Sequence, residues 1–251
     1  MKKLKLGPTL ILVGIVLILG AIGLVLYNNW DSARAGQESD RVLGELEDLL
    51  LTNPVPVPTA ETGRPIVVRP GGASQALEVE DPEDAEEPRI AGENDDTPHM
   101  ATVQVEEWKY IGVLEFPTLG LRLPVLNRWD YNRLRVAPCR YYGSVYNNNL
   151  VICGHNYTVH FSPVRSIALG ADVYFTDMTG TKYHYTVINT ETVQPMQVDE
   201  MIDPGGDWDM TLFTCNIGGA TRFACRCRLL DVTDPEGVVT EAAQEAPETA
   251  D

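Results

Sequence analysis

The strongest constraint on the fold is a series of short runs rich in Val, Ile, Tyr, Phe and Thr between residues 101 and 233. The runs are WKYIGVLEF, LRLPVLN, NNLVICG, DVYFTD, KYHYTVIN, ETVQPM, MTLFTC and RFACRCRLLD. Turn residues separate them, as in EFPTLG, YNNN, DMTGT and DPGGD, and only WDYNRLR and SPVRSIALG look briefly helical. Short strands at this spacing predict a mainly β domain over 101–233, a closed or nearly closed barrel of mostly antiparallel strands with one or two short helices.

The N-terminus contains an uncharged apolar segment from Leu6 to Tyr27. As a helix it would span about 33 Å, enough to cross a bilayer. Three lysines precede it, and Tyr27 and Trp30 stand at its far end. This pattern predicts a single-pass membrane anchor over residues 1–30, with a cytoplasmic N-terminus and the rest of the chain extracellular. The alternative, a cleavable signal peptide, would normally have a shorter apolar core.

The acidic residues lie mostly outside the predicted β domain. The chain carries a formal charge of −17, but residues 101–233 hold 13 acids and 11 bases. Residues 31–52 have a weak helical pattern, which predicts a juxtamembrane helix, and 53–100 are rich in proline and acids, which predicts a disordered stalk. The acidic residues 234–251 are predicted to form a disordered tail. No basic face is available for nucleic acid, so we expect no such partner.

The chain has five cysteines, at positions 139, 153, 215, 225 and 227. None has the paired spacing of a metal site. An odd number in an exported protein leaves at least one thiol unpaired, which fits a cysteine kept free for chemistry. A disulfide between Cys139 and Cys153 is an open alternative for two of the others.

The stretch TLFTCNIGGATRFACRC, residues 211–227, reads as a hairpin with a thiol at one strand end and a guanidinium at the other. In such a hairpin Cys215 and Arg222 form a cross-strand pair with Cβ atoms about 5 Å apart. Thr214, beside the thiol, is predicted to line a substrate groove. The structural alternative is a buried cysteine beside a solvated charge, and Arg226 on the same strand face is the alternative arginine.

A histidine follows another apolar strand, in LVICGHNY at residues 150–157. His155 would lie at the rim of a barrel, within reach of another strand's end. An imidazolium favours the reactive thiolate and can then protonate a leaving amine, while Arg222 suits the charge that develops on a carbonyl oxygen. A structural histidine is the alternative reading of His155, and His160 is the second candidate for the acid–base role.

These residues together resemble the sortase signature, in which a TLxTC strand, an arginine opening the next strand and a GH motif occur together. The resemblance covers about residues 108–231 and includes the middle segment FSPVRSIALGADVYFTDMTGTKYHYTVINTETVQP. It implies a sortase-like barrel and a membrane-anchored cysteine transpeptidase of Gram-positive surfaces. Cys215 would be the nucleophile, His155 the general acid and base, and Arg222 the donor to substrate and oxyanion. The implied partners are an LPxTG-like sorting signal and an amine on a cell-wall precursor or pilin.

The short Cys215–Arg222 connection and the lack of a long insertion after Val193 suggest a class D- or E-like enzyme. No cofactor is expected; Asp199, Glu200 and Asp203 could bind calcium, although such acids are more often solvated. Two other functions stay open. A cysteine hydrolase would use the same three residues with water as acceptor, and a surface adhesin would not need them.

Overall fold

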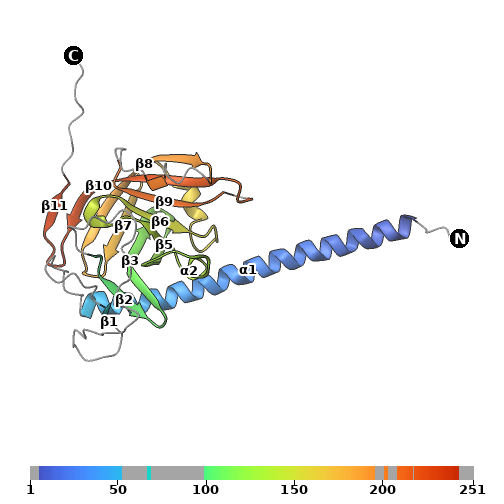
Figure 1. Ribbon diagram of the computed structural model, residues 1–251, viewed down its shortest axis with the longest axis horizontal. Helices are drawn as coiled ribbons and strands as arrows, with labels where there is room; N and C mark the ends of the chain where they lie inside the picture. The colour runs from blue at the N-terminus through green and yellow to red at the C-terminus, as the bar shows by residue number, and fades with distance from the viewer. Residues whose placement is uncertain are drawn as a thin grey trace, which may run out of the picture.

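The computed structural model describes residues 6–52, 67–68, 99–195, 201–202, 208–216 and 218–242 (Figure 1). Its helices are α1 (Leu6–Thr52) and α2 (Tyr131–Leu134), with 3-10 helices η1 (Pro117–Leu119), η2 (Val145–Asn147) and η3 (Pro163–Ser166). Its strands are β1 (Val67–Val68), β2 (Thr102–Val105), β3 (Trp108–Phe116), β4 (Leu121–Leu126), β5 (Cys139–Tyr142), β6 (Leu150–Gly154), β7 (Asp172–Asp177), β8 (Lys182–Val193), β9 (Met210–Cys215), β10 (Arg222–Thr233) and β11 (Val239–Glu241).

Strand pairing closes a ring in the order β3-β4-β5-β6-β9-β10-β8-β7, because β3 pairs with both β4 and β7. Most neighbours are antiparallel, whereas β4 with β5 and β6 with β9 are parallel. β2 extends the sheet from β3, and β11 pairs with the end of β10. The predicted mainly β fold, with few helices behind an N-terminal apolar helix, is confirmed.

Two apolar clusters lie on the two faces of this curved sheet, as alternating side chains require. The interior cluster fills the barrel and includes Ile111, Leu114, Phe116, Val125, Ile152, Phe161, Phe175, Tyr185, Leu212, Cys225 and Cys227. The outer cluster covers the other face and includes Val42, Leu46, Tyr110, Val113, Leu126, Cys139, Val151, Cys153, Val193, Met201, Phe213 and Ala224. Val42 and Leu46 belong to α1, so the helix is part of the barrel's outer packing.

The predicted anchor and the predicted juxtamembrane helix are parts of one continuous helix, α1, of 47 residues and about 70 Å. Large apolar side chains from Leu10 to Trp30 are exposed. Among the described residues, α1 is the one helix long and apolar enough to cross a membrane. It is therefore compatible with a membrane anchor.

The C-terminal half of α1 packs along the barrel through a single stripe (Figure 1). The buried positions are Ser32, Ala35, Ser39, Val42 and Leu46, which recur every three or four residues and so share one helix face. Small residues at the start of the stripe allow close approach to the loop after β6. A Cβ at Gly36 would lie 3.2 Å from the Val159 side chain.

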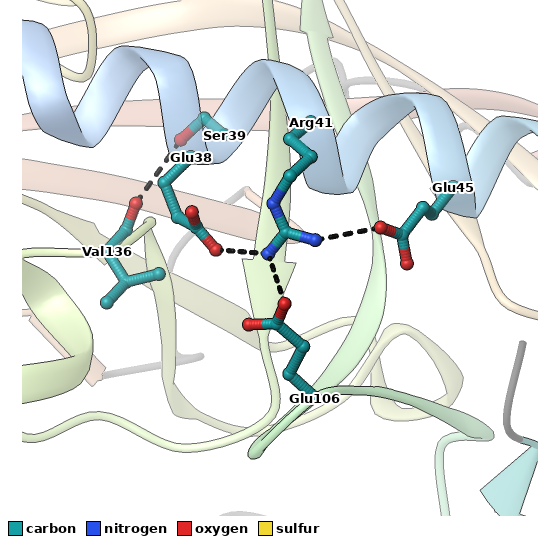
Figure 2. A network of polar contacts seen from close by, with 6 residues as sticks. All are labelled: Glu38, Ser39, Arg41, Glu45, Glu106 and Val136. Carbon is teal, nitrogen blue, oxygen red and sulfur yellow. Dashed lines mark hydrogen bonds and ion pairs between the residues drawn. The ribbon is translucent and has the colours of Figure 1, made fainter.

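Polar contacts border the stripe, as Figure 2 shows. Ser39 donates a hydrogen bond to the Val136 carbonyl, while Arg41 pairs with Glu38 and Glu45 of α1 and with Glu106 in the turn between β2 and β3. Exposed pairs of this kind add little stability individually, so the buried stripe carries most of the docking energy.

Two sequence predictions need correction. The disordered tail was predicted from residue 234, but residues 234–242 form a turn and strand β11 on β10. Asp234 accepts hydrogen bonds from the Glu236 and Val238 amides and Gly237 has a φ of 86°, so DPEG is a turn that acidic composition concealed. Strands β2 and β5 were not anticipated, and ETVQPM contributes to the end of β8 rather than forming a strand of its own. The stalk prediction falls mainly outside the described residues.

Candidate active site

The site is built at the turn end of the hairpin of β9 and β10. Cys215 and Arg222 are directly opposite each other in the antiparallel register, as the hairpin predicts. The tip is held by hydrogen bonds from the Asn216 amide to Thr221 and from the Gly219 amide to Asn216. Gly218 and Gly219 both have positive φ, 84° and 72°, which only glycine adopts freely. The turn therefore fixes the thiol and the guanidinium on one sheet face.

His155 enters from the neighbouring strand β6, which runs parallel to β9. Gly154 pairs with Thr214, so one further step along both strands sets His155 beside Cys215. A side chain at Gly154 would collide with the Phe161 ring, whose atoms would lie 2.3 Å from a Cβ. The Phe161 amide also donates to the His155 carbonyl. The GH sequence thus ends the strand and lets the following loop fold back over it.

The local environment favours the neutral imidazole of His155. Burial lowers its pKa below the ordinary value, and a hydrogen bond to Asn156 and the negative charge of Asp31 partly offset that effect. Its Nδ1 is buried and has no hydrogen-bond partner. A neutral imidazole can take the proton of a nearby thiol, and the resulting imidazolium can return it to a leaving group.

Two further residues at the site had no sequence signal. The Tyr157 ring stacks on His155 with centroids 3.9 Å apart and planes 13° apart. The Tyr157 hydroxyl donates to the Asp31 carboxylate of α1, which also faces Arg135 at 3.7 Å. Asp31 and Tyr157 are 126 residues apart in sequence, so only the folded chain reveals that the helix supports the histidine loop.

The two candidate arginines have different surroundings. Arg222 is half-buried, and its Nη1 donates to the carbonyls of Gly219 and Thr221 in the turn. Arg226 is 1% exposed; it donates to Glu191 at 2.7 Å and to Thr211 at 2.8 Å, and its guanidinium lies 4.6 Å from the Trp208 ring centre. Arg226 is thus held in structural contacts, while Arg222 is the arginine paired with Cys215.

Two other predicted site residues, Thr214 and His160, are buried. Thr214 is 2% exposed and alternates with Cys215, on the side of Leu212 and the interior cluster. The contact of Thr214 with substrate stays a prediction. His160, the second acid–base candidate, is fully buried and its Nε2 lies 3.3 Å from Ser39 Oγ, so it contacts α1. Asp199, Glu200 and Asp203 lie outside the described residues.

The cysteines divide into one accessible and four buried thiols. Burial raises the pKa of the Cys139 thiol, while a hydrogen bond between Cys227 and Cys225, together with burial, raises the pKa of Cys227. Cys139 and Cys153 face each other across β5 and β6 as free thiols. Cys215 is half-buried at the rim, where a substrate can approach it.

This chain is similar to sortases in both sequence and structure. A family described as "Sortase domain" matches residues 114–229. "Sortase A" of Bacillus anthracis is 30% identical over 149 residues, covering 56% of this chain and 70% of the relative.

Solved structures similar to this chain include three sortases. Listeria monocytogenes sortase A gives a TM-score of 0.46 at 21% identity, covering 50% of this chain and 90% of that one. Corynebacterium diphtheriae sortase A gives 0.44 at 22% identity, over 50% of this chain and 62% of that one. Streptococcus agalactiae sortase C1, in complex with MTSET, gives 0.44 at 19% identity, over 50% and 69%.

Proposed function

The chain belongs to the sortase family, and from that premise we propose that it is a membrane-anchored cysteine transpeptidase acting on LPxTG-like sorting signals. The observation that carries the proposal is the register of three strands. Cys215 faces Arg222 across one ladder, and the parallel neighbour β6 ends one residue before His155 at the same level. A thiol, an imidazole and a guanidinium at one rim can supply the nucleophile, the acid and base, and the oxyanion donor of acyl transfer through a thioester.

In the first step the Cys215 sulfur, as thiolate, attacks the threonine carbonyl carbon of the sorting signal. The carbon–nitrogen bond to the following residue breaks, and the leaving amine takes a proton from the His155 imidazolium. Arg222 turns from the turn carbonyls towards the substrate and stabilises the negative oxygen of the tetrahedral state. A donor of this kind contributes about 3 kcal/mol in other enzymes.

In the second step an amine of a cell-wall precursor or pilin attacks the thioester and gives its proton to neutral His155. The carbon–sulfur bond breaks, the new amide leaves, and the thiolate is restored. With water as the acceptor the same steps give hydrolysis. The acceptor therefore distinguishes a transferase from a hydrolase.

We propose that α1 crosses the cell membrane once, with the N-terminus in the cytoplasm and the barrel outside. The uncharged segment Leu6–Tyr27, the three preceding lysines and the aromatic pair Tyr27 and Trp30 support this orientation. The active site would then lie on the side where exported proteins emerge.

Mass spectrometry of the intact full chain in detergent, incubated with LPxTG-type peptides, tests the proposed chemistry. We expect a thioester adduct on Cys215 in the wild type and none in Cys215→Ala, which should keep the fold because the thiol is only half-buried. Adding a short amine should convert the adduct into a ligated peptide. If the only product were the peptide with a free carboxylic acid, the protein would be a hydrolase. Undiminished cleavage by Cys215→Ala would exclude both the cysteine transpeptidase and the cysteine hydrolase.

A further inference from the structure

The segment Arg128–Arg135, which contains α2, lies beside the point where the exposed apolar half of α1 ends. Arg135 faces Asp31 of α1 at 3.7 Å. One residue past the segment, the Val136 carbonyl accepts a hydrogen bond from Ser39 of α1 at 3.2 Å. The barrel therefore meets α1 within one turn of Trp30.

The contact extends further along the helix, to the aromatic residue that ends its uncharged segment. Hydrogen bonding to Tyr157 and the charge of Asp31 raise the pKa of Arg135, and a hydrogen bond to Tyr27 adds to this effect. Tyr27 and Trp30 have ring centres 6.3 Å apart and are both exposed. Tyr and Trp at the end of a spanning helix lie at the level of the lipid headgroups.

The surface of this segment has the composition of a membrane interface. Trp129 and Tyr131 are 41% and 79% exposed, with ring centres 5.9 Å apart. Three arginines, at positions 128, 133 and 135, lie beside two acids, because Asp130 pairs with Arg133 and Asp31 of α1 pairs with Arg135. Amphipathic aromatic rings and arginine side chains both suit the boundary between headgroups and water. We call residues 128–135 the α2 patch.

The α2 patch is also connected to the candidate active site. Trp129 contacts Tyr141 with ring centres 5.3 Å apart, and Tyr141 meets the edge of Phe213 at 5.1 Å. Phe213 lies two residues before Cys215 on the same face of β9. In Figure 1, α2 and the turn between β9 and β10 both lie at the end of the barrel that faces the N-terminal half of α1.

We propose that the α2 patch rests on the headgroups of the outer leaflet and holds the active-site end of the barrel against the membrane surface. This inference rests on the proposed function only in that α1 must span the membrane. The partner is the lipid surface itself, because α1 delivers the patch to it and the exposed rings of Trp129 and Tyr131 suit its headgroup layer. Substrates would then reach Cys215 from the plane of the membrane rather than from bulk solution.

A fluorescent label on the patch tests this contact without relying on catalysis. In the Cys215→Ala background the four remaining cysteines are buried, so Tyr131→Cys offers a single reactive thiol for bimane. The full chain is reconstituted in vesicles of phosphatidylcholine and phosphatidylglycerol, with or without lipids brominated close to the headgroup. Val239→Cys is the matched control, because it is 59% exposed on β11, at the opposite end of the barrel (Figure 1).

We expect the brominated lipids to quench at least half of the emission at position 131 and to leave position 239 unchanged. The difference between wild type and Trp30→Phe in intrinsic fluorescence reports whether α1 has inserted. Quenching of Trp30 with equal, negligible quenching at 131 and 239 would overturn the membrane contact and leave the anchor intact. Unquenched Trp30 would overturn the proposed anchor, and the membrane contact with it.

Discussion

The interior cluster and the outer cluster contain similar apolar residues but are held together in different ways. The interior cluster is made by strands that pack their alternate side chains into one closed space. The outer cluster is bordered by hydrogen bonds between segments far apart in sequence, including Ser39 with His160, Tyr157 with Asp31, and Arg226 with Glu191. The first arrangement specifies the barrel, and the second attaches α1 and supports the site. The two clusters should therefore respond differently to cavities, to loss of a polar partner and to pH.

The largest effect on stability is expected from a cavity in the interior cluster. Phe116 is fully buried and meets Phe161 edge-on, with ring centres 6.1 Å apart. Phe116→Ala should lower the free energy of unfolding by about 3–5 kcal/mol, measured by urea denaturation of the full chain in detergent. Val239→Ala, at an exposed position, should change it by less than about 0.5 kcal/mol. Equal effects at the two positions would mean that the barrel is not closely packed.

Substitutions of the two arginines of β10 should have different effects, one on activity and the other on stability. Arg222→Ala should lower kcat/KM for an LPxTG-type peptide about 100-fold, because in the proposed mechanism Arg222 is the charged donor to the oxyanion. Arg226→Ala should instead cost about 3 kcal/mol of stability, because it leaves Thr211 and Glu191 without their buried partner. Steady-state kinetics and urea denaturation of both variants check this. The opposite order in kcat/KM would transfer the catalytic role to Arg226.

His160 should make the outer cluster sensitive to acid. Burial and the neighbouring His155 lower the pKa of His160 to about 4, so the folded protein keeps this imidazole neutral. The unfolded chain takes up a proton near pH 6.5, so folding loses stability as the pH falls from 6.5 towards 4, by about 3 kcal/mol. His160→Gln should remove most of this loss, measured as the difference in unfolding free energy between pH 7 and pH 4.5. An unchanged pH dependence would show that the Ser39 contact does not hold a neutral histidine.

Much of the barrel could be predicted from sequence because its signals are local. The run WKYIGVLEF coincides with β3, and the two stretches with a helical look contain α2 and η3. Two glycines mark the turn of the hairpin. Because the residues on either side of a hairpin turn pair with each other, Cys215 and Arg222 could be predicted to face each other. β2 and β5 were not recognised because four-residue strands hold too few residues to establish an alternating pattern.

The attachment of α1 could not be predicted, because its contacts depend on how distant segments meet. The stripe Ser32, Ala35, Ser39, Val42 and Leu46 begins with small and polar residues, which give a weak hydrophobic period. Asp31 has no sequence neighbour that points to Tyr157. Arg222 and Arg226 lie on one strand face. Only the folded positions of Glu191 and Trp208 show that Arg226 is the arginine held in structural contacts.

The smallest effect is expected at His184, on the outside of β8. His184 bonds to Asp231 at 2.8 Å and to Asp172 at 2.9 Å. Burial alone would lower its pKa, but the hydrogen bonds and charges of the two carboxylates outweigh burial and raise it. The resulting stabilisation is complete below pH 6.5 and is lost as the pH rises through the raised pKa. His184→Gln should therefore cost about 0.5–1 kcal/mol at pH 5.5 and almost nothing at pH 9.

This dependence has the opposite sign to that of His160, and urea denaturation at several pH values distinguishes the two. The double variant His160→Gln, His184→Gln should show the sum of the two single effects, because the two histidines lie on different parts of the barrel and share no hydrogen-bond partner among those described. A double variant that departs from the sum would mean that α1 and the strand β8 are energetically coupled through the barrel wall. The outer contacts could then not be treated as titrating separately.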